Sequence, residues 1–433
     1  MMKSQLGDLC KRCKKESTSV VTRKDTFCEN CFIRFIRGKQ RKQMQDDKFK
    51  VRFKETDDRL SLLLDMKNDF ESFVLLDSLI SMLQEQLTQG PKAVRGFNLT
   101  VSIIEDYKDS ESHIDISRIE QYYTTEELTR LGIKFVIVDP DTFISTNGIE
   151  KLRLDLEHFE ITKVQADMIH PQTKTYNDLL AQVVDNSTRE DIAAVIHEDL
   201  IIETAIENKC SIIVKSHSMT TLAIDILSDT IRGRGAEIPR KSDDIYIGNF
   251  EILHPLRDVL NSETRMYTKV MKLDALSPVL QETISISDKS TKNKTVYDMV
   301  SEYFMTLEVD YPDVVSTVVK IGAKLANPSP ETVKFHCEMC KNPIYHDPKQ
   351  WLEQITVPGF VPPQNEEEEA NLRRYLDAVA KEEKPEVPAG EASLLKLCYG
   401  CMVTLGVSNV HDFEWPQRPT REEILAEYII DTD

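Results

Sequence analysis

The sequence lacks a long apolar run. Its N-terminus, MMKSQLGDLCKRCKK, is basic, but cysteines and lysines follow where a secretory signal or a membrane span needs an apolar segment. We therefore expect no membrane association and a cytoplasmic location. In that reducing compartment the nine cysteines are not expected to form a disulfide framework. The 433 residues, 40% hydrophobic and 29% charged, are typical of a globular chain with more than one domain.

Acidic residues outnumber basic ones over the whole chain, but basic residues are in excess at its beginning. The formal net charge of −19, taken alone, argues against a nucleic-acid partner. Residues 1–54, however, hold 16 Lys+Arg and 6 Asp+Glu, a net charge of +10, which leaves −29 for the remainder. Such asymmetry is typical of a basic module that meets a polyanion while the bulk of the protein stays acidic.

Glycine is missing from the turn that follows the first predicted strand, LSLLLD (60–65). A strand, a turn and a helix in this order often bind a nucleotide phosphate, and glycine lets the backbone amides approach it. Asp69 and Glu71 would repel a polyphosphate here, although acidic residues suit a helix N-terminus. We predict that the nucleotide-binding fold is kept but that this turn no longer binds ATP. The degenerate loop consists of Lys67, Asn68, Asp69, Phe70, Glu71 and Ser72.

Apolar runs alternate with helical periodicity through the middle of the chain. A helix is expected over 219–231, and another begins at Ser187, with Glu190 completing a capping box. Continuous Val/Ile/Leu strands separated by helices predict an α/β fold with a doubly wound parallel sheet. The predicted strands are 60–65, 97–104, 134–139, 210–214 and 244–253.

Eight of the nine cysteines form four CxxC pairs near the two ends of the chain. Two such pairs supply four thiolates for a closed, structural zinc site with no open position for catalysis. The first two pairs lie 14 residues apart, the reach of a short hairpin, and 57 residues separate the last two. We predict two structural Zn²⁺ sites. The ligands are Cys10, Cys13, Cys28 and Cys31 for the first and Cys337, Cys340, Cys398 and Cys401 for the second.

Other readings of these cysteines stay open. One alternative is that each C-terminal pair completes a site with an N-terminal pair, and another is that the pairs are redox thiols, which occur as single CxxC motifs. His336 and His346 flank the third pair as substitute ligands, but with four cysteines present we favour surface positions for both.

A basic segment, FIRFIRGKQRKQMQDDKFKVRFK, follows the first cysteine set. It predicts either phosphate contacts along RNA or a helix with a solvated basic face, and we favour RNA. A second basic turn, at 232–235, either meets an RNA phosphate or caps its helix through Gly233. The candidate RNA-binding residues are Arg34, Arg37, Lys39, Arg41, Lys42, Arg232 and Arg234.

Several polar residues of the middle region are interpreted as structural. Asp225 and Asp229 are expected on a solvated helix face. The pair at 197–198 lacks the second histidine of a zinc-binding HExxH motif. His217 and His254, at predicted strand ends, are expected to be ordinary hydrogen-bonded histidines.

Four stretches in combination resemble the PP-loop tRNA-thiolation proteins. They are the paired CxxC motifs followed by FIRFIRGKQR, then IVKSHSMTTLAIDILSDTIRGRGAEIP (213–239), FEILHPLRDVLNSETRMY (250–267) and the closing LCYGC. The resemblance covers nearly the whole chain. Within the family, the sequence is similar to the partner-subunit branch, the cytoplasmic tRNA 2-thiolation protein 2 family, and not to the catalytic subunits.

The resemblance implies a protein without catalytic activity of its own. Active members carry an SGGxDS-type loop, with which only Ser72 agrees here, and a glycine expected near residues 215–216 is missing. Active members also carry three cysteines within the α/β domain, where this sequence has only Cys210, which is expected to be a small buried apolar residue.

The resemblance also implies the partners and the domains. The chain would form a heterodimer with the catalytic PP-loop paralogue and help to hold tRNA, whose wobble uridine is thiolated at the 2-position. Sulfur would arrive as a thiocarboxylate on a ubiquitin-related modifier protein. The expected domains are a zinc ribbon with a basic arm (1–45), a PP-loop-like Rossmann-type α/β domain (46–330) and a second zinc ribbon with an acidic insertion (331–433).

Two other functions remain open from the sequence. The first is an ATP-dependent tRNA thiolase with an unusual phosphate site. The second is a zinc-ribbon scaffold that binds proteins alone through the acidic insertion at 366–369.

Overall fold

The structure forms two compact units, each built from segments that are distant in the sequence. The first comprises Met1–Thr142 and Glu190–Asn327, and the second Phe143–Arg189 and Pro328–Asp433. The division into domains at residues 45 and 330 stays a prediction. The computed structural model describes residues 9–23, 25–54, 59–105, 113–145, 148–155, 160–163, 172–242, 245–247, 250–281, 293–325, 333, 335–348, 351, 363, 365–381, 396–407 and 412–416. None of the helices in these ranges combines the length and apolar character that crossing a bilayer requires.

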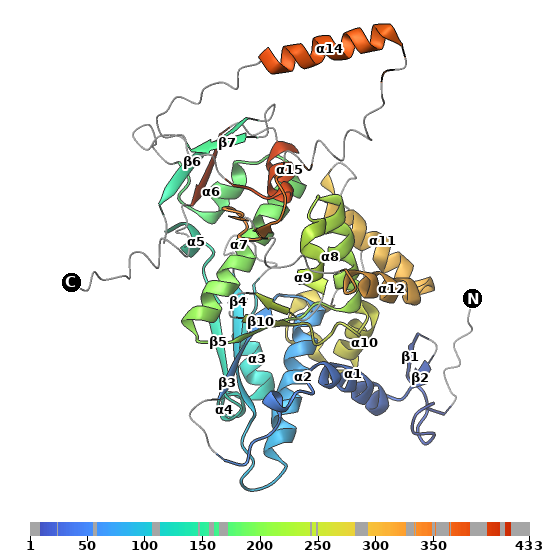
Figure 1. Cartoon of the computed structure of the whole chain (residues 1–433). Helices are drawn as coiled ribbons and strands as arrows, with labels where there is room; N and C mark the ends of the chain where they lie inside the picture. Colours follow the sequence, from blue (N-terminus) through green and yellow to red (C-terminus); the bar gives the residue numbers. More distant parts are fainter. Residues whose placement is uncertain are drawn as a thin grey trace, which may run out of the picture. The chain divides into compact units, whose positions relative to one another are not determined.

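A six-stranded sheet in the order β5-β4-β3-β8-β10-β9 forms the centre of the first unit (Figure 1). The first five strands in this order run parallel, and β9 is an antiparallel edge strand. This confirms the predicted α/β fold with a parallel sheet. The strands are β3 (Leu60–Met66), β4 (Phe97–Ile104), β5 (Ile133–Val138), β8 (Ile212–Lys215), β9 (Ile245–Ile247) and β10 (Phe250–Leu253).

Both faces of the sheet are buried. Successive residues of a strand point to opposite faces, and in β3 Leu62 and Leu64 join an apolar core with α2 (Phe70–Leu87), while Leu63 packs with Ile201 of α7 (Asn186–Glu207). The predicted apolar strand runs therefore reflect burial on two sides. The remaining helices of this unit are α3 (Ile116–Tyr123), α4 (Thr125–Arg130), α8 (Met219–Ile231), α9 (Ile238–Ser242), α10 (Asn261–Met271), α11 (Val296–Asp310) and α12 (Pro312–Gly322).

Two details of the predicted elements are wrong. The strand expected over 244–253 is an antiparallel pair, with Ile252 opposite Ile245. The residues between its two halves, Gly248 and Asn249, lie outside the described ranges. The helix expected to start at Ser187 begins one residue earlier, because the carboxylate of Asp185 accepts the backbone N–H of Thr188 at 2.7 Å.

The N-terminal segment belongs to the first unit. A short hairpin, β1 (Val20–Thr22) and β2 (Asp25–Phe27), leads into helix α1 (Glu29–Gln43). Phe32 and Ile36 of α1 are fully buried and share one apolar core with Tyr267 of α10. The basic helix is therefore amphipathic, with one face fixed to the α/β domain.

A three-stranded antiparallel sheet organises the second unit, in which β13 (Asp412–Pro416) pairs with β6 (Ile149–Asp155), and β6 pairs with β7 (Glu160–Lys163). The buried rings of Phe143 and Trp415 pack edge to face, with centroids 5.5 Å apart. The unit therefore joins chain segments more than 250 residues apart. Its other elements are α5 (Thr142–Ser145), α6 (Tyr176–Ala181), β11 (Phe335–His336), β12 (Pro343–Ile344), α14 (Glu366–Lys381) and α15 (Tyr399–Val407).

Candidate functional site

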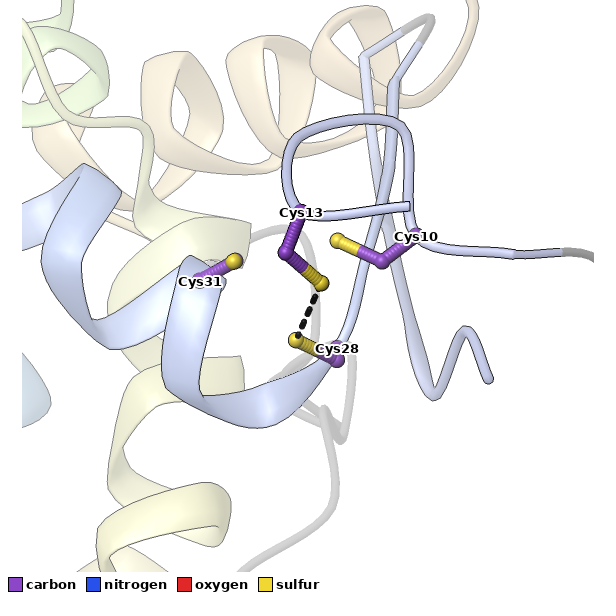
Figure 2. A group of neighbouring side chains, drawn as sticks. All are labelled: Cys10, Cys13, Cys28 and Cys31. Carbon is purple, nitrogen blue, oxygen red and sulfur yellow. Dashed lines mark hydrogen bonds between the residues drawn. The ribbon is translucent and has the colours of Figure 1, made fainter. Parts of the chain in front are cut away.

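The N-terminal cysteines converge on one point (Figure 2). Cys10 and Cys13 lie on a tight turn before β1, and Cys28 and Cys31 lie at the N-terminus of α1. The four sulfur atoms all lie within 4.8 Å of one another, and Cys13 Sγ is 3.9 Å from Cys28 Sγ. The hairpin β1–β2 spans the 14 residues between the pairs, so that both pairs face each other as predicted.

The C-terminal cysteines repeat this construction. The sulfur atoms of Cys337, Cys340, Cys398 and Cys401 also lie within 4.8 Å of one another. In both sets the residue after the first pair, Lys14 or Lys341, adopts positive φ (54° and 58°), and its N–H donates to the carbonyl of the first cysteine at 2.8 Å. In both sets the second pair starts a helix. The structure thus pairs the two C-terminal motifs with each other, which confirms that prediction over the alternative of pairs shared between the chain ends.

Both cysteine sets fit a tetrahedral metal ion. Ligand sulfurs about 2.3 Å from zinc lie about 3.8 Å apart along a tetrahedral edge. The measured Sγ–Sγ distances of 3.9 Å (Cys13–Cys28) and 3.6 Å (Cys340–Cys398) match that edge and are far too long for disulfides. All eight thiols are free. Hydrogen bonds from backbone N–H groups outweigh burial and lower the pKa of Cys10 to about 6, whereas burial raises the pKa of Cys31 in the same set.

The flanking histidines stand apart from these sets. His336 is exposed on β11, and the ring of His346 stacks on Trp351 with centroids 6.2 Å apart. Neither belongs to the four-cysteine groups, in agreement with the favoured reading.

The basic residues of α1 divide into two faces. Arg37 binds Asp77 at 3.0 Å, and Arg41 binds Glu85, both on α2. Arg34 and Lys42, eight residues apart, are exposed to solvent. Arg34 and Lys42 are therefore the two basic residues of α1 best placed to meet an external polyanion.

Glu263 ties the N-terminal ribbon to the α/β domain. Its side chain is fully buried at the start of α10 and accepts hydrogen bonds from Arg23 of the hairpin (3.0 Å) and Lys39 of α1 (3.0 Å). Burial opposes ionisation of Glu263, but these two cations lower its pKa. The segment that carries the N-terminal cysteines is thus held by charge as well as by the apolar core.

The basic turn after α8 is a helix cap. Gly233 has φ 73°, and the N–H of Arg234 donates to the carbonyl of Asp229 at 2.7 Å, which forms a Schellman motif. Arg234 is 4% exposed and binds both carboxylate oxygens of Asp191, with Nε 3.0 Å from Oδ1. Arg232 binds Glu190 at 2.8 Å. The geometry favours the capping interpretation, and these guanidinium groups have carboxylate partners inside the protein.

The turn after β3 is closed by its own side chains. The carboxylate of Asp69 accepts the N–H of Ser72 at 2.7 Å and thereby caps α2. The hydroxyl of Ser72 accepts the N–H of Lys67 (3.0 Å) and lies 2.9 Å from the hydroxyl of Ser216 at the end of β8. Asn68 binds Ser277 at 2.7 Å. The N–H groups of Lys67 and Ser72 are therefore engaged by protein oxygens instead of a ligand.

A buried ionic network lies at the carboxyl end of β3, and sequence reasoning missed it. Asp65 is 2% exposed and binds Lys215 of β8 at 3.1 Å and His197 of α7 at 2.9 Å, while Lys215 also binds Glu198 at 2.7 Å. Burial opposes ionisation of Asp65, but His197 and Lys215 hold its pKa well below the ordinary value. The sequence did carry one signal for this network, because an ionisable residue stands at the end of each of two apolar runs that form adjacent strands.

The two aspartates of α8 are not on a solvated face, so that expectation is wrong. Asp229 is 5% exposed and binds Lys241 at 2.9 Å, and Asp225 lies 3.3 Å from Nδ1 of His217. Burial and the charge of Asp229 raise the pKa of Asp225 to about 7. The rings of His217 and His254 lie 5.8 Å apart. These groups gather where a parallel sheet usually binds its ligand.

Two comparisons of the sequence with known proteins match the same family. The family model of cytoplasmic tRNA 2-thiolation protein 2 matches residues 295–403. Proteins of that name from Debaryomyces hansenii and Scheffersomyces stipitis are 33% and 35% identical to this chain, and each comparison covers 98% of this chain and 96% of the relative. Among solved structures, the U34-tRNA thiolase NcsA from Methanococcus maripaludis with its 4Fe-4S cluster matches at 17% identity and a TM-score of 0.49, covering 77% of this chain and 92% of that chain.

Proposed function

Because this chain belongs to the cytoplasmic tRNA 2-thiolation protein 2 family, we propose that it is the non-catalytic subunit of a cytoplasmic complex that 2-thiolates the wobble uridine of tRNAs. It pairs with a catalytic PP-loop paralogue and helps to hold tRNA, and sulfur reaches the complex as a thiocarboxylate on a ubiquitin-related modifier. Each four-cysteine set holds one structural Zn²⁺, which fixes the fold of its ribbon and takes no part in chemistry.

The closed turn after β3 is the single observation that carries the non-catalytic role. A polyphosphate bound at this turn would have to displace the carboxylate of Asp69 from the N-terminus of α2 and would then lie beside its charge. The turn has no glycine whose backbone could approach a phosphate closely. Cys210 is buried among apolar side chains, as predicted, and is 4% exposed, which suits no sulfur carrier.

We expect no ATP binding in the micromolar range when the full-length chain is titrated in a calorimeter. The reason is that side-chain oxygens of Ser72 and Asp69 already accept the backbone N–H groups of Lys67 and Ser72. Micromolar affinity that disappears in Lys67→Ala would contradict the proposal and would favour an active ATP-dependent thiolase.

Reversing the two exposed charges of α1 is expected to weaken tRNA binding. In the Arg34→Glu, Lys42→Glu double variant, the affinity of the reconstituted complex for tRNA should fall at least about tenfold, and the slope of log affinity against log salt should shrink by about two. These side chains are exposed, so the fold should not suffer. Filter binding at several salt concentrations measures both quantities.

The matched control is Lys320→Glu, Lys324→Glu, which reverses two exposed charges in the last turn of α12 and just beyond its end. It makes the same change in net charge and should leave tRNA affinity nearly unchanged. If the α1 variant binds tRNA like the control, the RNA role of α1 is wrong, and a scaffold that binds only proteins becomes the better reading.

A further inference from the structure

The corner between α11 and α12, residues 309–314, exposes a cluster of apolar side chains. Seventeen large apolar side chains are exposed in the described part of the chain, and seven of them lie between positions 299 and 325. Three of the seven fall within the corner itself, where Val309 is 81% exposed, Tyr311 62% and Val314 42%. Apolar side chains that gather on a surface in this way mark an interaction site, whereas single ones scattered over a surface are ordinary.

The backbone of this corner is fixed although its side chains are exposed. One face of each helix packs in a buried cluster with α8 (Figure 1), to which the two helices contribute Val300, Phe304, Val315 and Val319. The N–H of Tyr311 donates to the carbonyl of Leu307 at 2.7 Å, and Pro312 begins α12, where a proline costs no hydrogen bond. A partner that binds here therefore does not have to order a loop first, which lowers the entropic cost of association.

Acidic residues accompany the apolar ones. Asp310 and Asp313 are exposed in the corner, and no lysine or arginine stands between Lys294 and Lys320 in the sequence. RNA is a polyanion and would be repelled by these carboxylates. A symmetric contact between the corners of two copies is disfavoured for the same reason, because it would bring like charges together. The surface therefore fits a different protein, one with an apolar pocket whose rim carries lysine or arginine.

We propose that the α11–α12 corner docks the catalytic PP-loop paralogue, with Val309 and Tyr311 inserted into an apolar pocket that basic side chains surround. Tyrosine is enriched among the residues that dominate binding energy, because it buries a large ring at a small cost in conformational entropy. Asp310 and Asp313, at the rim of the contact, speed the encounter and set its orientation. This inference rests on the proposed function and deepens it, since it assigns the surface that meets the expected partner.

Truncating the two most exposed apolar side chains of the corner should weaken the heterodimer. In Val309→Ala, Tyr311→Ala the dissociation constant for the purified paralogue should rise at least about tenfold, because the side chains that fill the partner's pocket are lost. Biolayer interferometry with both full-length proteins measures it. The unfolding midpoint of the isolated variant should stay close to that of wild type, since both side chains are exposed.

The matched control removes two apolar side chains of similar exposure elsewhere on the same unit. Ile206 and Ile231, at the C-terminal ends of α7 and α8, are 61% and 55% exposed. In Ile206→Ala, Ile231→Ala the dissociation constant should stay within about twofold of wild type. If the corner variant binds the paralogue like this control, the docking role of the corner is wrong.

The charge of the corner has a test of its own. Asp310 is the last residue of α11, where a cation suits the helix dipole better than a carboxylate does. Asp310→Lys should therefore keep or raise the unfolding midpoint and yet slow association with the paralogue at least about threefold, a difference that shrinks in high salt. Association as fast as that of wild type would show that no basic rim faces the corner, which overturns the proposal.

The other possible occupants give different results. When affinity for the paralogue is unchanged in Val309→Ala, Tyr311→Ala, a lower unfolding midpoint would place a segment of this chain on the corner. An altered sedimentation coefficient of the isolated chain would place a second copy there, and weaker binding of tRNA would place RNA there. Wild type that does not bind the paralogue refutes the proposed heterodimer and the docking role together, whereas equal binding by wild type and corner variant refutes the docking role alone.

Discussion

Replacing Cys31 with serine is expected to lower the zinc content of the purified full-length chain from two equivalents to one. The four sulfurs of its set lie within 4.8 Å of one another, and a closed site loses its tetrahedral geometry when one thiolate is removed. Because structural zinc binding supplies about 10–16 kcal/mol of apparent free energy, the hairpin β1–β2 should become open to proteolysis. Elemental analysis by mass spectrometry and limited proteolysis measure the two effects.

Cys210→Ala is the control for this experiment. Cys210 is a buried cysteine outside both sets, so its replacement should leave two zinc equivalents in place. Iron instead of zinc in wild type, or unchanged zinc in Cys31→Ser, would show that the proposed structural role of the N-terminal set is wrong.

Replacing Asp65 with asparagine is expected to lower the free energy of unfolding by about 3–5 kcal/mol at neutral pH, because it removes one partner of a buried ionic network. Lys215, which is nearly inaccessible, would keep only Glu198 as its carboxylate partner. Denaturant titration of the full-length chain measures the loss. Asp47→Asn, which breaks an exposed ion pair with Lys50, is the control and should leave stability within measurement error.

The pH dependence of this loss has a definite sign. The pKa of Asp65 is lower in the folded chain than in the unfolded chain, where it is about 3.9. Its ionisation therefore stabilises the fold fully above the unfolded pKa, and the contribution is lost as the pH falls through the folded pKa. The difference between wild type and Asp65→Asn should shrink as the pH falls below about 4. A difference that grows on acidification would contradict this assignment.

Local sequence patterns predicted the elements and the cysteine sets well. The bounds of β4 and α8 agree with the predicted ranges 97–104 and 219–231, since apolar periodicity reflects burial directly. The pairs Cys10–Cys13 and Cys28–Cys31 are close in the chain, so that a hairpin brings them together. The sequence did not reveal the antiparallel strand β9, because two short antiparallel strands within one apolar run have the same composition as a single long strand.

The polar partnerships were not predictable in the same way. Asp229 and Asp225 have the spacing of a solvated helix face, yet contacts with Lys241 and His217 bury them. The second unit joins β6 to β13, whose residues Leu152 and Phe413 are 261 positions apart. No local pattern carries information about a partner at such a distance.

The sequence by itself determined the α/β class, the absence of a glycine-lined phosphate turn, the two four-cysteine sets and the family. These depend on residue type and on spacing along the chain, which a sequence states outright. Only the tertiary structure decided that Arg37 and Arg234 face carboxylates within the protein. A charged side chain acts according to its burial and its partners, and folding alone brings those partners to it.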